Sequence, residues 1–124
     1  MRNIITWFEI PSADINRAKA FYEALLETPI GDVQDFGGLK MAAFARPENS
    51  SATTGTIVQH PQYTPSHQGS LLYFDGEKDL APMLARVEPA GGKILQPKTL
   101  ISPTIGHMAL FEDTEGNRMA IFSQ

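Results

Sequence analysis

The stretch that determines the fold covers residues 108–122 and reads Met-Ala-Leu-Phe-Glu-Asp-Thr-Glu-Gly-Asn-Arg-Met-Ala-Ile-Phe. Apolar runs at 108–111 and 119–122 flank the polar residues 113–117. Because acidic residues, glycine and asparagine tolerate turn conformations, including a positive φ at Gly116, this pattern predicts a β-hairpin. Alternation along the second run defines two faces, one with Arg118, Ala120 and Phe122 and the other with Met119 and Ile121.

The bulk properties predict one soluble domain. The 124 residues can form a core without crosslinks, and the apolar fraction of 42% is ordinary for a globular protein. A net charge of −4 and the lack of a Lys/Arg run argue against a nucleic-acid partner. The chain has no cysteine, which excludes disulfides, thiolate metal sites and a cysteine nucleophile. With neither a membrane-spanning run nor a signal peptide, we expect a cytoplasmic protein that handles a small molecule, with no membrane partner.

Upstream of the hairpin, the chain repeats one order of elements. Module one, residues 1–59, is predicted to contain a strand at 4–10, a helix capped by Asp14, and strands at 30–36, 39–45 and 56–58. Residues 60–68 contain two prolines and no periodicity, so we interpret them as a connector.

Module two, residues 69–124, starts the same order again. We expect a strand at 70–74, a helix capped by Asp79, a strand at 93–101 and then the hairpin. Pro97 makes the strand at 93–101 an edge or bulged strand. The chain is therefore predicted to be one α+β domain, in which two βαβββ modules form curled mixed sheets around an open cavity with helices on the outer face.

The first strand carries the most informative polar residue. Its apolar residues Ile4, Phe8 and Ile10 are predicted to face the helices, which leaves Trp7 and Glu9 on the concave side. A partly desolvated Glu9 carboxylate could act as a general base or anchor a cation; the alternative is that it pairs with a basic neighbour or stays solvated. Together with the indole of Trp7, it favours ligands that combine a planar part with positive charge.

Four segments in register resemble the vicinal oxygen chelate superfamily, which contains glyoxalase I, extradiol dioxygenases and the bleomycin-resistance proteins. They are Trp-Phe-Glu-Ile-Pro at 7–11, Asp-Ile-Asn-Arg-Ala-Lys-Ala-Phe-Tyr at 14–22, Ala-Gly-Gly-Lys at 90–93, and Phe-Glu-Asp-Thr-Glu-Gly-Asn-Arg at 111–118. The resemblance spans nearly the whole chain. It implies two βαβββ modules around an open cavity, usually assembled as a homodimer.

In metal-dependent members of that superfamily, His, Glu or Gln side chains on strands of both modules hold a divalent ion. The resemblance carries these positions to Trp7, to Ser70 or Leu72, and to Ala120. Trp7, Leu72 and Ala120 cannot bind a metal, and a lone Ser70 would bind one poorly. We therefore expect the usual metal site to be missing, and no cofactor is predicted.

The histidines offer an alternative metal site. His60 and His67 lie in the connector and His107 begins a strand, so they share neither a short spacing nor an element. A metal held by these residues and Glu9 stays open, as does a proton-carrying role for His107. Tyr63 in the connector is a candidate to cover the cavity. The full set of expected ligand-binding residues is Trp7, Glu9, Tyr63, Leu72, Phe74, His107 and Ala120.

Two functions follow from the sequence. The first is a metal-independent protein that binds a small organic molecule, like the bleomycin-resistance group, and that pairs with a second copy of itself as a homodimer. The second is a glyoxalase-like lyase, isomerase or dioxygenase. Such an enzyme would use a divalent metal at a non-standard site, or Glu9 as its general base. Binding is favoured because the metal positions lack ligands and no catalytic pair replaces them.

Overall fold

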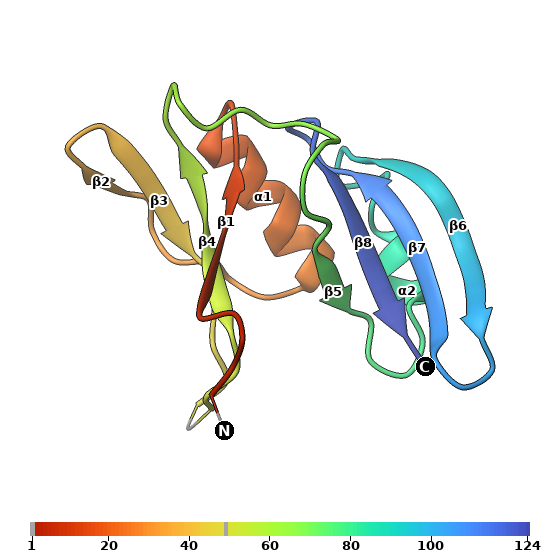
Figure 1. Ribbon diagram of the computed structural model, residues 1–124. Helices are drawn as coiled ribbons and strands as arrows, with labels where there is room; N and C mark the ends of the chain where they lie inside the picture. The colour runs from red at the N-terminus through yellow and green to blue at the C-terminus, as the bar shows by residue number, and fades with distance from the viewer. Residues whose placement is uncertain (1, 49) are drawn as a thin grey trace.

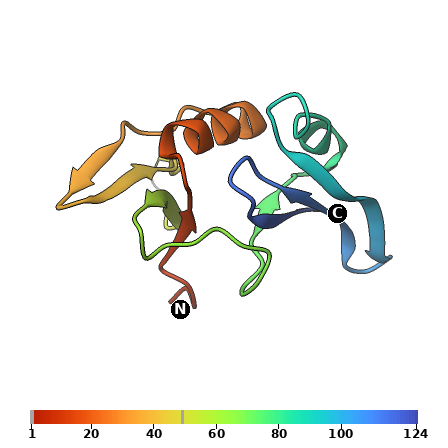
Figure 2. The ribbon, with the colours of Figure 1, turned by 90° about the horizontal axis from the view of Figure 1, so that it is seen from above.

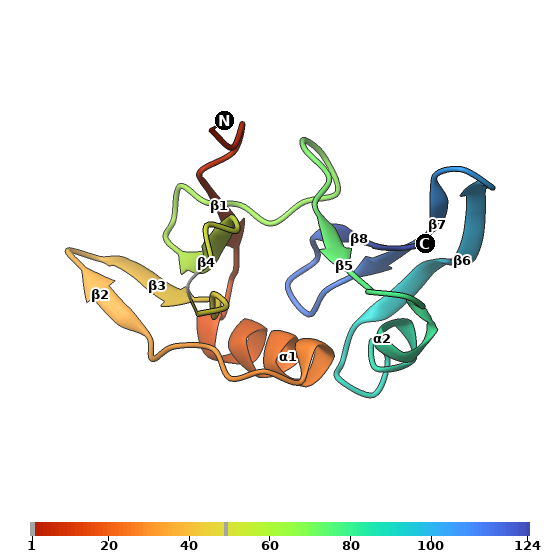
Figure 3. The same ribbon diagram turned by 90° about the horizontal axis from the view of Figure 1, so that it is seen from below.

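The computed structural model describes residues 2–48 and 50–124 and shows two four-stranded mixed sheets side by side (Figure 1). The strand orders are β1-β4-β3-β2 and β5-β8-β7-β6, and in each sheet one parallel pair, β1 with β4 or β5 with β8, accompanies the antiparallel ones. Both helices lie on one side of the sheets, and the connector between β4 and β5 crosses on the other side (Figures 2 and 3). The predicted α+β fold with two βαβββ modules is confirmed.

Module one contains a helix that its local sequence predicts well. Its elements are β1 (Trp7–Pro11), α1 (Ile15–Leu26), β2 (Gln34–Phe36), β3 (Leu39–Ala43) and β4 (Thr54–Gln59). As predicted, the Asp14 side chain caps α1 by accepting hydrogen bonds from the backbone N–H groups of Asn16 and Arg17. The buried residues of α1 follow the helical period and are Ile15, Ala18, Phe21, Tyr22 and Leu25.

Module two contains the β-hairpin that residues 108–122 predict. Its elements are β5 (Tyr73–Asp75), α2 (Ala81–Ala85), β6 (Lys93–Ser102), β7 (Gly106–Glu112) and β8 (Arg118–Ser123). Antiparallel pairing of β7 with β8 confirms the hairpin, and Gly116 has the expected positive φ of 94°. β6 is an edge strand with register shifts on both sides of Gln96, as Pro97 indicated.

The first strand starts later than predicted. Ile4 is 95% exposed and lies outside β1, so its expected position against the helices was wrong. The partner strand β4 begins at Thr54, which pairs with Trp7, so residues 4–6 have no strand beside them. Ile10 is fully buried, as expected.

The observed boundaries of three other elements also differ from the predicted ones. The strand predicted at 30–36 is only β2, an exposed edge strand of three residues. The strand predicted at 70–74 begins at Tyr73, the first residue whose partner lies on β8. Leu80, not Asp79, is the N-cap residue of the short α2, although the Asp79 carboxylate accepts a 2.9 Å hydrogen bond from the Ala81 N–H. No helix among the described residues is long and apolar enough to cross a membrane.

The turn of the β7–β8 hairpin joins the two modules. The buried carboxylate of Asp113 accepts a 2.7 Å hydrogen bond from the hydroxyl of Tyr22 on α1 and a 2.9 Å bond from the Asn117 side chain. Its other oxygen accepts the backbone N–H groups of Glu115 and Asn117, at 2.8 and 2.9 Å. We call the set Tyr22, Asp113, Glu115, Asn117 and Arg17 the polar joint.

Glu115 completes this polar joint at the start of α1. Its carboxylate accepts the backbone N–H groups of Ala13 and Asp14 at 2.9 and 2.8 Å. Arg17 adds a two-pronged ion pair at 2.8 and 3.0 Å. In the core next to the polar joint, the ring of Tyr22 stacks on Phe74, and the two ring centroids are 5.5 Å apart. The turn of module two is thus fixed to the helix of module one.

Candidate functional site

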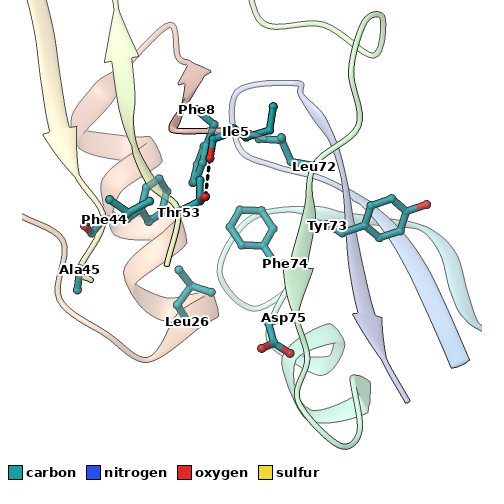
Figure 4. A pocket seen from close by; sticks show the side chains of 11 residues that line it. Ile5, Phe8, Leu26, Phe44, Ala45, Thr53, Leu72, Tyr73, Phe74 and Asp75 are labelled. Carbon is teal, nitrogen blue, oxygen red and sulfur yellow. Dashed lines mark hydrogen bonds between the residues drawn. The ribbon is translucent and has the colours of Figure 1, made fainter. Parts of the chain in front are cut away.

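An apolar cavity of about 530 Å³ lies between β1 and β5, the first strands of the two modules. Most of its wall is hydrophobic, and its lining residues are Ile5, Phe8, Leu26, Phe44, Ala45, Thr53, Thr54, Leu72, Tyr73, Phe74 and Asp75. Phe74 points into this space toward Phe44, whereas Tyr73 points away (Figure 4). We call this cavity the apolar chamber.

A second cavity of about 400 Å³ adjoins the first, because Ile5, Phe8 and Leu72 line both. Its remaining lining residues are more polar and are Trp7, Glu9, Pro11, Thr64, Ser66, Gln68, Ser70, Asn117, Arg118 and Met119. We call it the polar chamber, and the two chambers together the cleft. A cleft with an apolar end and a few polar groups is typical of sites for small organic molecules.

The position of Phe8 between the chambers depends on a glycine. Gly55 on β4 lies opposite Phe8 in the parallel register. A Cβ on Gly55 would overlap the Phe8 carbonyl oxygen and lie 2.7 Å from Cγ of the Phe8 ring. Only a glycine at this point lets the ring occupy its place in the wall.

Glu9 has a neighbour from the connector. The pKa of Tyr63 is raised above its usual value, first by hydrogen bonding to the Glu9 carboxylate and then by the negative charge of that group. Tyr63 itself lines a separate hollow with Lys40, Gln59 and His60, so it lies beside the polar chamber and not in its wall.

The residues expected from the sequence are brought together only in part. Trp7, Glu9 and Leu72 line the polar chamber, and Phe74 lines the apolar one. Ala120 is fully buried outside both linings, where its N–H donates a 2.9 Å hydrogen bond to the Leu72 carbonyl. His107 lies outside both linings too, with its Nδ1 3.0 Å from the Gln124 carbonyl oxygen.

Sequence reasoning overlooked Arg118 and Leu26 as cavity residues, and placed Phe44 only as a wall or core residue. The alternation of the last strand gave a signal for Arg118, since it placed this residue on the same face as Ala120. Leu26 and Phe44 come from the end of α1 and from the residue after β3, and no local pattern links them to the strands they face.

The residues present do not fit the metal site of the superfamily. Trp7, Leu72 and Ala120 offer no donor atoms, although Trp7, Ser70 and Leu72 line one chamber. In residues 2–48 and 50–124, no group of three His, Cys, Asp or Glu side chains could hold an ion. The histidines have separate contacts: His67 Nε2 lies 2.7 Å from Glu112, and the ring of His60 lies beside Tyr63.

The sequence model of the Glyoxalase/Bleomycin resistance protein/Dioxygenase superfamily matches residues 4–121. The chain belongs to this superfamily. Its relatives include a glyoxylase-like domain-containing protein of Didymella fabae, 28% identical over 121 residues, which are 94% of this chain and 91% of the relative.

Two solved structures show how widely this fold is shared. TnmS3, an antibiotic binding protein from Streptomyces sp. CB03234, is 23% identical and superposes with a TM-score of 0.69 over 98% of this chain and 96% of its own. Glyoxalase I from Zea mays is 10% identical and superposes with a TM-score of 0.76 over 96% of this chain and 44% of its own. A binding protein and an enzyme therefore share this architecture, so the fold alone does not determine the function.

Proposed function

We propose that this superfamily member binds a small organic molecule in the cleft, without a metal at the position that the family uses. The observation that carries the proposal is that the two chambers lie next to each other and share the lining residues Ile5, Phe8 and Leu72. The apolar chamber offers aromatic walls for the body of a ligand, and the polar chamber offers a few groups to orient it. Support also comes from TnmS3, a protein of the same fold that is described as antibiotic binding.

Trp7 is the natural contact for a planar ligand. Its side chain lines the polar chamber and is 45% exposed, so an indole face is available for stacking. Glu9 lines the same chamber and would attract a positively charged group on the ligand. Trp7 is also the only tryptophan in the chain, which makes its emission a specific reporter of this chamber.

We further expect the protein to act as a homodimer in the cytoplasm. Each sheet leaves two edge strands, β1 and β2 in the first and β5 and β6 in the second, and unpaired edges favour association. Large exposed side chains on and beside the second sheet, Tyr73, Leu100 and Ile105, add apolar surface. Sedimentation should give twice the 13.6 kDa chain mass, and a concentration-independent monomer would refute the dimer.

The second candidate function is proton transfer in a glyoxalase-like lyase or isomerase. The observation that favours it is the hydroxyl of Tyr63, a proton donor that lies beside the polar chamber and next to the Glu9 carboxylate in its lining. Glu9 would then act as the general base. An activity abolished by Glu9→Gln, with ligand binding retained, would favour this function over simple binding.

The experiment that tests the proposal is a titration of Trp7 emission with a library of small planar compounds. Saturable quenching or spectral shifts are expected for some of them, and Glu9→Gln should weaken cationic hits more than neutral analogues. Glu88→Gln, a change at an exposed residue outside the cleft, is the matched control. Hits that bind without changing Trp7 emission would place the binding site elsewhere.

Elemental analysis of untagged protein tests the metal part of the proposal. Zn, Ni, Mn and Fe should each be well below one per chain. Stoichiometric metal that is lost on mutating Glu9 or one of the histidines would overturn the metal-independent function and support the enzyme.

A further inference from the structure

We propose that Arg118 anchors an anionic group of the bound molecule, so that the ligand is a planar or aromatic organic acid. This inference rests on the proposed function and names the class of ligand. Arg118 begins β8 and lines the polar chamber together with Trp7. Its Nε atom is buried and has no hydrogen-bond partner among the described residues. No ion pair or side-chain hydrogen bond of Arg118 is found among the described residues, so the part of its guanidinium that lines the polar chamber can donate to a ligand oxygen.

The groups next to Arg118 make their hydrogen bonds with other residues. Glu112 lies opposite Arg118 in the β7–β8 register, but one of its carboxylate oxygens, Oε1, lies 2.7 Å from Nε2 of His67, and its ion pair is with that histidine. The side-chain oxygen of Asn117 accepts the Ser66 N–H at 3.2 Å, and its amide group donates to the Pro11 carbonyl at 2.7 Å. Within residues 2–48 and 50–124, Arg118 Nε has no hydrogen-bond partner.

The backbone of Arg118 is held in place before any ligand arrives. β8 lies between β5 and β7 in the second sheet, and the Arg118 N–H donates a 3.3 Å hydrogen bond to the Ser66 carbonyl. A guanidinium on a fixed strand is preorganised, which reduces the entropy lost on binding. Its planar fork suits the two oxygens of a carboxylate, and a lysine would lack this geometry.

The surrounding walls define the rest of the ligand. An aromatic body in the polar chamber can contact Trp7, Phe8 and Leu72, and the apolar chamber of about 530 Å³ adjoins it there. Glu9 shares the polar chamber with Arg118 and disfavours a second negative charge. A ligand with one carboxylate, with or without a positively charged group for Glu9, therefore fits this cleft.

The test compares 2-naphthoate with its uncharged analogue 2-naphthamide by calorimetry. The wild-type protein should bind the acid at least about fivefold more tightly than the amide, because a charge-assisted hydrogen bond is formed only with the acid. Arg118→Gln should remove this preference, because it weakens the binding of the acid much more than that of the amide. Arg118→Lys, which keeps the charge and loses the fork, should retain only part of it.

The matched control is Lys93→Gln, which removes one positive charge from the exposed start of β6 and should keep the full preference. Equal affinities of the wild-type protein for both compounds would overturn the role of Arg118 and leave the proposed function standing. The same conclusion would follow if Arg118→Gln weakened both compounds equally. Binding of neither compound would overturn the role of Arg118 and the proposed function together.

Discussion

The two modules meet in two places of opposite character. In the polar joint, the carboxylates of Asp113 and Glu115 accept hydrogen bonds from Tyr22 and Arg17 on α1 and from the backbone of the turn. In the cleft, Arg118 Nε has no partner among the described residues, and aromatic side chains face open space. We infer that the joint holds the modules in place relative to each other, and we propose that the cleft takes the ligand.

Breaking the joint should give the largest effect on stability. Asp113→Ala leaves the buried Tyr22 hydroxyl and the N–H groups of Glu115 and Asn117 without their acceptor, and should lower the free energy of unfolding by about 3 kcal/mol or more. Urea denaturation measures this change. Asp32→Ala, at a fully exposed side chain, should change stability by less than about 0.5 kcal/mol. Similar values for the two variants would contradict the structural role of the joint.

Glu115 should make the joint sensitive to acid. Burial raises the pKa of this carboxyl, but hydrogen bonds from Arg17, from the Asp14 N–H and from Thr114 outweigh it, and the pKa falls below its ordinary 4.5. A lowered pKa adds stability above about pH 4.5, which is lost as the pH falls through the lower folded-state value.

Glu115→Gln measures this contribution directly. At pH 7 the variant should be less stable by roughly 2 kcal/mol, and the difference from the wild type should shrink as the pH is lowered toward 3. Urea denaturation across this range provides the data. A difference that is constant with pH would show that the charge of Glu115 contributes nothing.

Gly55→Ala tests the wall that separates the two chambers. The new Cβ would meet the Phe8 backbone and ring, so we expect a loss of roughly 1–2 kcal/mol together with weaker binding in the cleft. Gly31→Ala is the control, since a Cβ there meets its nearest neighbour at an ordinary 3.5 Å. Unchanged stability and binding in Gly55→Ala would mean that the Phe8 ring does not need this position.

Changes inside the cleft should affect stability least. Trp7→Phe removes a half-exposed indole that the core does not require, so the free energy of unfolding should stay within about 0.5 kcal/mol of the wild type. Ligand affinity should nevertheless fall, as stacking area is lost. Unfolding and calorimetric titrations of the same variant separate the two effects. A stability loss as large as that of Asp113→Ala would assign Trp7 to the fold and not to the site.

The contrast between joint and cleft also explains what the sequence could predict. α1 and the hairpin carry local signals, the capping Asp14 and the turn glycine Gly116, and both elements form as expected. The start of β1 could not be read locally, because it depends on where β4 begins, more than forty residues later. The same applies to the cleft. Phe44 and Phe74 line the apolar chamber, and Trp7 and Arg118 line the polar one, yet the two members of each pair come from different modules and are brought together only by the tertiary fold.

The most direct test of the central claim, that the cleft is the ligand site, is a map of backbone amide shifts in a ¹⁵N-labelled sample titrated with 2-naphthoate. The largest shifts should fall on the cleft strands, at Trp7, Phe8, Leu72 and Phe74, while the turn at residues 113–116 stays nearly unchanged. Shifts concentrated on that turn, or on the distant edge strands β2 and β6, would contradict the assignment of the cleft.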